Sequence, residues 1–344
     1  MKVAAGTPTP RPNFAHILAM SDRRGTFEHA EFASPRPEHG YCTDDMARVL
    51  IAAVRHPSEE AAVDGLVHLA LRFLVDAQAV GGGVRNRMDR HGHWEDRPKV
   101  EDAWGRSIWA LGTAVAQSDA ASVRMVAADQ VARAARQRSV WPRAMAFAAL
   151  GAAELLGALP DHAPARALLV DAAAAMPRPT SDAAWPWPEP RLTYGNAVLP
   201  EAMLAAGVVL DDATLRQQGL DLLGWLLAHE TADGHISVTP AGGGGVGEVG
   251  PRFDQQPIEV AALADACARA ATVDGSTSWP AGVAAAVDWF LGDNDAQAVM
   301  WDPATGGGFD GLVAHGVNLN QGTESTLALL TTLQHARRPV SAAR

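Results

Sequence analysis

Apolar residues recur along the chain at the 3.6-residue spacing of helices, in runs that come in pairs. The first run of each pair is more uniformly small and apolar than the second, so we expect it to be the more buried helix. The six buried runs are residues 43–54, 100–115, 141–156, 192–207, 253–271 and 320–336. The amphipathic runs are residues 60–78, 121–137, 162–175, 212–229 and 280–291, and residues 12–21 are expected to supply a sixth.

This alternation predicts an all-α fold, an (α/α)6 barrel with six inner and six outer helices. A helix that is apolar nearly all round needs protein on every side, whereas an amphipathic helix faces water on one side. An open stack of helical repeats is the alternative, but such repeats keep a nearly fixed period. Here the inner helices are spaced by about 40 to about 65 residues. No linker-like segment interrupts the pairs, so we expect a single domain over residues 1–344, with the helix at 12–21 closing the outer ring.

The connections from an outer helix to the next inner helix are long, rich in glycine and often contain tryptophan. They cover residues 80–98, 177–191, 235–252 and 292–319. Long loops are uncommon in compact domains unless they build a site. All of them precede inner helices, so the N-terminal ends of these helices are expected to carry the function.

Charge and cysteine content narrow the classes of partner. The formal net charge is −11 with scattered acidic residues, which disfavours nucleic acid and anionic membranes. Cys42 and Cys267 belong to no metal-binding motif, and the pair His91 and His93 has no evident third ligand, so we expect reduced thiols, no metal and no cofactor. The N-terminus has no apolar signal core and no run is long enough to span a membrane, which predicts a cytoplasmic protein.

Two neighbouring inner helices begin alike. Asp44 precedes Arg48 as Asp102 precedes Arg106, and residues four apart share a helical face and can form an ion pair. We therefore expect both arginines to hold carboxylates in place. For Thr43 and Asp44, helix capping or ion pairing remains an alternative to contact with a substrate.

Acids, amides, a phenol, an arginine and tryptophans gather at the predicted helix starts. Sugars need this combination, because their apolar faces stack on aromatic rings while their hydroxyls need donors and acceptors. Two tryptophans in the proline-rich stretch WPWPEPR are expected to form a cleft wall. The candidate substrate-binding residues are His39, Tyr41, Asp44, Asp45, Trp104, Trp185, Trp187, Glu189, Arg191, Tyr194, Asn196, Gln255, Gln256, Glu259, Asn320 and Gln321.

Five motifs carry a family resemblance over roughly residues 13–335: HGYCTDDMAR, VEDAWGRSIWALG, WPWPEPRLTYGNAVLPEA, FDQQPIEVAALADA and NLNQGTEST. They resemble a bacterial α/α-toroid, glycosyl-hydrolase-like family found next to, or fused with, glycosyltransferases. More loosely, the plan is similar to six-hairpin glycosidases and N-acylglucosamine 2-epimerases. The resemblance implies an (α/α)6 fold, a carbohydrate context and a separate glycosyltransferase as partner, but no established reaction. Relatives commonly have Asn where this chain has Met46.

The leading functional hypothesis is a glycoside hydrolase that acts on an oligosaccharide or glycoconjugate. Such enzymes use two carboxyl groups, and acids on different helices of a broad barrel suit the wider separation of an inverting mechanism. One partner is expected to be Glu101 or Asp102, and the other Asp254 or Glu324.

Two other classes remain open. A sugar-binding accessory protein of a glycosyltransferase would keep the aromatic and amide residues but would need no acid with a raised pKa. A sugar epimerase normally uses histidines as acid and base, and the helix starts offer only His39.

Overall fold

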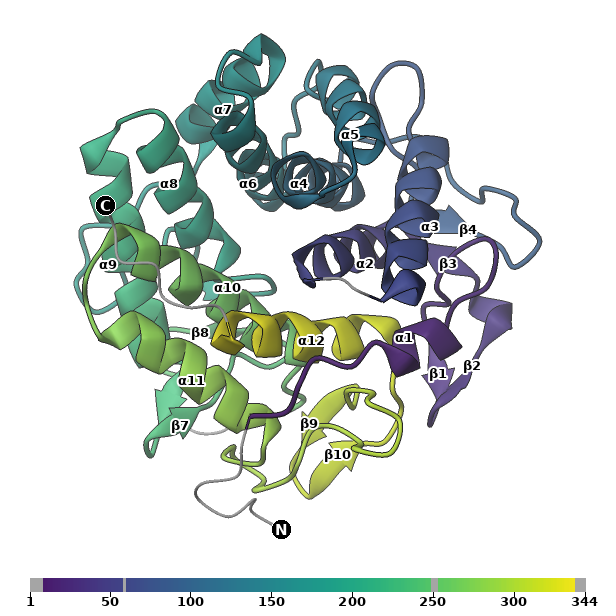
Figure 1. Ribbon diagram of the computed structural model, residues 1–344. Helices are drawn as coiled ribbons and strands as arrows, with labels where there is room; N and C mark the ends of the chain where they lie inside the picture. Colours follow the sequence, from purple (N-terminus) through teal and green to yellow (C-terminus); the bar gives the residue numbers. More distant parts are fainter. Residues whose placement is uncertain (1–8, 58–59, 249–252, 338–344) are drawn as a thin grey trace.

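The computed structural model describes residues 9–57, 60–248 and 253–337, and these contain twelve α-helices in two concentric rings (Figure 1). Each inner helix contacts the next, and α12 contacts α2, so the inner ring is closed. The predicted (α/α)6 barrel is confirmed. The inner helices are α2 (Thr43–Arg55), α4 (Asp102–Gln117), α6 (Pro142–Ala158), α8 (Val198–Val209), α10 (Pro257–Val273) and α12 (Thr323–Arg337). The outer helices are α1 (Ala15–Ala19), α3 (Ala61–Ala77), α5 (Ala121–Ala134), α7 (Ala163–Ala175), α9 (Ala213–His229) and α11 (Ser278–Phe290).

Burial follows the two kinds of run in the sequence. In α4 every residue from Ala103 to Val115 is buried, whereas α3 buries a stripe that includes Val63, Leu66, Val67 and Ala70 and exposes its other face. Small residues bring the most tightly packed inner helices together. A Cβ atom on Gly112 of α4 would collide with the carbonyl oxygen of Gly151 on α6.

Five short antiparallel strand pairs lie at the loop-rich end of the barrel. Every strand belongs to a segment that precedes an inner helix. Some pairs form within one such segment and others join two of them, so the strands fix the loops around the helix starts. The pairs are β1 (Ala30–Glu31) with β2 (Ser34–Pro35), β3 (Tyr41–Cys42) with β4 (Arg87–Met88), β5 (Arg191–Leu192) with β8 (Gly244–Gly245), β6 (Thr231–Ala232) with β7 (His235–Ile236), and β9 (Gly311–Val313) with β10 (Gly316–Asn318). A 3-10 turn, η1 (Pro37–His39), precedes β3.

Three helix boundaries differ from the prediction. The run at 192–207 becomes helical only at Val198, because Leu192 pairs with Gly244 and Gly195 adopts a positive φ of 55°. The run at 253–271 begins at Pro257, since Gln255 pairs with Leu312 in an isolated bridge. The first outer helix is only five residues long. Residues 249–252 of the predicted connection 235–252 lie outside the described part of the chain.

Among the described residues, no helix is both long and apolar enough to cross a membrane.

Candidate functional site

A cavity of about 440 Å3 opens at the starts of α2, α4 and α12, and we call it the entrance cavity. It gathers carboxylates from three helix starts and from the connections before them. Its lining residues are Glu28, His29, Cys42, Asp44, Asp45, Arg48, Asp102, Arg106, Tyr194, Gln256, Asp310, Asn318, Gly322, Glu324 and Ser325.

Arg48 links two sides of the entrance cavity. Its guanidinium lies 2.7 Å from Asp45 Oδ1 on its own helix and 2.6 Å from Glu324 Oε2 on α12. Asp45 is almost fully buried, and this burial raises its pKa to about 7 even though Arg48 favours the charged form. The ion pair with Glu324 therefore joins α2 to α12 where both helices begin to line the cavity. It leaves the Glu324 side chain partly exposed.

Arg106 reaches the same cavity from α4. Its Nε lies 3.5 Å from Asp44 Oδ1, and its guanidinium stacks over the ring of Phe147 at 3.9 Å. Asp44 Oδ2 accepts a hydrogen bond of 3.0 Å from the Asn86 side chain. The predicted pairing within each helix is therefore wrong in detail, because Arg48 pairs with Asp45 and Arg106 pairs with Asp44 of the neighbouring helix. Both arginines nevertheless hold carboxylates in place.

A second cavity of about 790 Å3 adjoins the first, and we call it the outer cavity. The two share Asp44, Asp102 and Tyr194. The Tyr194 hydroxyl donates a hydrogen bond to Asp102 Oδ2, while the residue as a whole remains 47% exposed. The other lining residues of the outer cavity are Val84, Asn86, Arg87, Asp96, Lys99, Glu101, Ala103, Trp104, Trp141, Pro142, Arg143, Glu189 and Thr193.

The turn that carries Tyr194 is held by buried polar groups. Glu259 accepts hydrogen bonds from the backbone N–H groups of Gly195, at 2.6 Å, and Asn196, at 3.3 Å. Arg143 makes two hydrogen bonds of 2.8 Å to Glu189 and a third to Asn196. Burial raises the pKa of Glu259, although the two N–H groups favour its ionised form. Glu259 and Asn196 thus hold, from the buried side, the turn by which Tyr194 lines both cavities.

The two cavities bring together part of the predicted set. These residues are Asp44, Asp45, Glu101, Asp102, Trp104, Glu189, Tyr194, Gln256 and Glu324. Glu101 lies in the outer cavity beside Lys99, whereas Asp102 and Glu324 line the entrance cavity together. Asp254 is exposed and lines neither cavity. The catalytic roles of these acids remain predictions.

The aromatic residues expected at the site are mostly packed into the protein. Trp185 and Trp187 are buried next to Trp225 of α9 and line neither cavity, so the expected cleft wall is not found there. Tyr41 is buried and its hydroxyl donates to Asp22. Trp104 is fully buried at the edge of the outer cavity.

The remaining predicted residues also have local partners. Gln255 contacts Asp295, Gln321 contacts Thr305 and Asp302, and the side chain of Asn320 accepts the N–H of Phe32. Arg191 forms an exposed ion pair with Glu248, and His39 is exposed next to His29. These five residues line neither cavity.

Several lining residues were missed by the sequence analysis. Glu28, His29 and Asp310 come from connections whose course only the folded chain shows. Trp141 was assigned to a helix, but its position directly before Pro142 at a helix start was a usable signal. Burial raises the pKa of Asp310, whose Oδ1 accepts the N–H of Gly322 at 2.7 Å.

Donor atoms of Glu28, Cys42 and Asp45 lie within 4.8 Å of one another, which is the spacing of a metal site. However, Arg87 pairs with Glu28 and Arg48 pairs with Asp45. Burial also raises the pKa of the Cys42 thiol, and metal ligation requires the thiolate. The donor set therefore fits a metal ion poorly. His91 and His93 are exposed, and their backbone N–H groups donate to Asp89.

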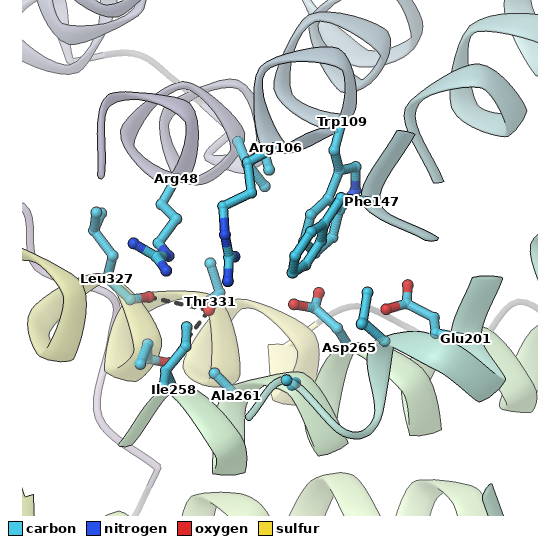
Figure 2. A pocket seen from close by; sticks show the side chains of 15 residues that line it. Arg48, Arg106, Trp109, Phe147, Glu201, Ile258, Ala261, Asp265, Leu327 and Thr331 are labelled. Carbon is cyan, nitrogen blue, oxygen red and sulfur yellow. Dashed lines mark hydrogen bonds between the residues drawn. The ribbon is translucent and has the colours of Figure 1, made fainter. Parts of the chain in front are cut away.

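Below the entrance cavity the barrel narrows to a mostly apolar space of about 50 Å3, shown in Figure 2. Arg48 and Arg106 line this space and the entrance cavity alike, and Trp109 and Phe147 form part of its wall. Asp265 and Glu201 lie deeper along the barrel.

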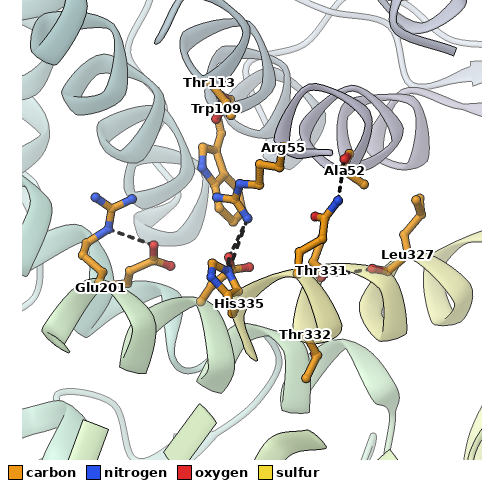
Figure 3. Close-up of polar contacts among 12 residues, drawn as sticks. Ala52, Arg55, Trp109, Thr113, Glu201, Leu327, Thr331, Thr332 and His335 are labelled. Carbon is orange, nitrogen blue, oxygen red and sulfur yellow. Dashed lines mark hydrogen bonds and ion pairs between the residues drawn. The ribbon is translucent and has the colours of Figure 1, made fainter. Parts of the chain in front are cut away.

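At the end of the barrel opposite the entrance cavity, each of these two acids has its own basic partners, and Figure 3 shows this region. Asp265 lies 2.7 Å from Arg55 and 2.5 Å from His335, and Glu201 lies 2.9 Å from Arg269. Both acids are thus held by cationic partners, and we take the loop-rich end as the candidate site.

Comparisons with known proteins agree on the architecture. No protein-family model matches the chain, and no curated protein matches it in sequence. A sugar epimerase from a ruminal bacterium superimposes with a TM-score of 0.67 and 14% identity, over 94% of this chain and 95% of that one. The cellobiose 2-epimerase of Spirochaeta thermophila gives 0.68 and 14%, over 93% and 92%.

A cellulase of C. cellulolyticum gives a TM-score of 0.59 and 10% identity, over 91% of this chain and 86% of that one. At these identities the similarity establishes the fold. The resemblance to six-hairpin glycosidases and 2-epimerases is thus confirmed for the (α/α)6 architecture. These structures do not bear on the expected glycosyltransferase partner, which stays a prediction.

Proposed function

We propose that this protein is a carbohydrate-active enzyme, and that it hydrolyses a glycosidic bond in the entrance cavity. One observation carries the proposal: six carboxylates, from α2, α4, α12 and the connections before α2 and α12, line this cavity together with two arginines. Glycoside hydrolysis needs one carboxylic acid and one carboxylate around the scissile bond. The sugar epimerases and cellulases that share the fold support a carbohydrate substrate.

We assign the base to Asp102. It begins α4 on one side of α2 in the inner ring, while α12 lies on the other side. The Tyr194 hydroxyl donates to its Oδ2, which orients the carboxylate. From this position Asp102 would activate water on one face of the sugar.

We assign the general acid to Asp310, which lies in the segment before α12. A general acid must carry a proton when the substrate binds, and burial raises the pKa of Asp310 in the direction that this role needs. An acid and a base on opposite sides of a broad cavity suit an inverting mechanism. Glu324 lies on the same side of the cavity as Asp310 and is held by Arg48, so we assign it to binding sugar hydroxyls.

The test is a panel of gluco-, manno- and galacto-oligosaccharides of defined linkage, with the products and their anomeric form followed by NMR. We expect cleavage with inversion, and a loss in kcat of about 10²- to 10⁴-fold in both Asp102→Asn and Asp310→Asn. Glu324→Gln should mainly raise KM, and Asp233→Asn, in the exposed turn between β6 and β7, is the control that retains wild-type rates. Full activity in Asp102→Asn with loss in Glu324→Gln would move the base to Glu324.

Sugar epimerisation is the second candidate, supported by His29. It is the one histidine among the lining residues of the two cavities, and its ring lies 4.9 Å from that of His39. The reaction in D2O separates the two functions. Epimerisation of a reducing disaccharide would place deuterium next to the carbonyl carbon without cleavage and would be lost in His29→Asn, with exposed His93→Asn as control. Binding without either reaction would indicate a glycan-binding accessory protein.

A further inference from the structure

Trp141 differs from the other tryptophans of this protein. All ten lie in the described residues, and Trp141 alone among them is exposed, at 57%. It directly precedes α6 and lines the outer cavity. An indole left largely in water at the wall of a cavity offers an apolar face that a ligand can cover, and sugar rings stack on such faces.

The outer cavity continues from the proposed reaction site. Asp44, Asp102 and Tyr194 belong to both cavities, so the proposed base lies at their junction. A substrate whose scissile bond lies beside Asp102 in the entrance cavity would therefore extend one sugar residue into the outer cavity, toward Trp141.

The charges around the outer cavity indicate what kind of sugar fits. Its three described cations each have a carboxylate partner. Lys99 lies 3.3 Å from Glu101, Arg143 lies 2.8 Å from Glu189, and Arg87 pairs with Glu28. An acidic sugar would have to compete with these carboxylates for the three cations. A neutral sugar can hydrogen-bond to the ion pairs without breaking them.

We propose that the outer cavity is a second sugar subsite, in which a neutral hexosyl residue stacks on Trp141. The substrate class is then a neutral disaccharide or longer oligosaccharide that spans Asp102. This inference rests on the proposed function, since it takes the entrance cavity as the first sugar site.

The experiment measures binding to the full-length Asp310→Asn variant by isothermal titration calorimetry, because this change removes the proposed acid and lies outside the outer cavity. The probes are cellobiose, mannobiose and galactobiose, their monosaccharides, and a disaccharide that contains a uronic acid. For the neutral disaccharide that binds, we expect a Kd about tenfold below that of its monosaccharide. Adding Trp141→Ala should raise the disaccharide Kd about tenfold and leave the monosaccharide Kd unchanged.

Two further variants complete the test. Trp141→Phe should retain most of the disaccharide advantage, and Met125→Ala, an exposed apolar residue on α5, should behave as the parent protein. An unchanged Kd ratio in Trp141→Ala, or equal binding of the uronic-acid disaccharide, would overturn the subsite while leaving the proposed function intact. If none of the sugars bound, the proposed function would be contradicted and the subsite with it.

Discussion

Carboxylates with similar sequence surroundings acquire different properties in this barrel. Asp44 and Asp45 are neighbours, yet Asp44 faces Asn86 and Arg106 while Asp45 is buried against Arg48 with its pKa raised to about 7. Asp265, at the opposite end, has its pKa lowered. Its burial acts to raise the pKa, but the positive charge of Arg55 and the contact with His335 outweigh that effect. Burial and the charged partners that the fold brings into contact decide what each acid can do.

The Asp265→Asn variant tests this balance. The change leaves the buried Arg55 without its carboxylate, so we expect the free energy of unfolding to fall by about 3–5 kcal/mol near neutral pH. A lowered pKa contributes stability above the unfolded value of about 4, and that contribution is lost as the pH falls. The difference in free energy of unfolding between wild type and variant should therefore become smaller below about pH 4.

Urea denaturation across this pH range measures the gap, with Asp233→Asn in the exposed β6–β7 turn as the control. A gap that stays constant down to about pH 3 would show that Asp265 is not the source of the pH dependence.

At the scale of elements, the contact between α4 and α6 depends on glycine. Cβ atoms on Gly105 and Gly112 would collide with the backbone of α6, and one on Gly151 would collide with the backbone of α4. Such clashes involve rigid backbone, so the helices would have to move apart. Because α4 also carries Asp102, this packing sets the position of the proposed base.

Gly112→Ala should therefore destabilise the protein by at least about 1–3 kcal/mol. Gly157→Ala is the matched control on α6, since a Cβ atom there meets nothing within 4 Å and alanine is the better helix former. The control should be neutral or raise the free energy of unfolding by up to about 1 kcal/mol. Equal effects of the two changes, measured by chemical denaturation, would refute the close-packing argument.

At the scale of the whole molecule, the two ends of the barrel carry different features. The end where inner helices begin carries the five strand pairs and the two adjoining cavities, whereas the other end carries ion pairs such as Arg55 with Asp265. The narrow interior between the ends is lined mainly by apolar side chains. In our proposal, the substrate binds at one end of the ring, and the ion pairs at the opposite end hold the helices together.

Hydrogen–deuterium exchange with a neutral disaccharide that binds can test this division. We expect added protection in residues 39–48, 99–106 and 320–325, because these segments surround the cavities. Residues 50–56 and 265–273, at the other end, should change little. Protection confined to residues 50–56 and 265–273 would show that the ligand binds at the end opposite the one we propose.

The hydrophobic pattern determined the ring of helices because it records how each helix face is covered. Runs apolar all round, such as 100–115, had to be enclosed, and amphipathic runs such as 60–78 had to cover them. The same order placed the long connections, and hence the proposed site, at the N-terminal ends of the inner helices. These features follow from local periodicity and chain order.

The tertiary structure decided which side chains share a cavity. It brought Asp310 and His29 beside Asp102 and Glu324, and it turned Trp185 and Trp187 inward while leaving Trp141 exposed. A helical pattern fixes which face of a helix is buried, but it does not fix how far a loop folds over the barrel or which arginine a carboxylate meets. Those outcomes depend on contacts between segments distant in the sequence, which only the closed ring specifies.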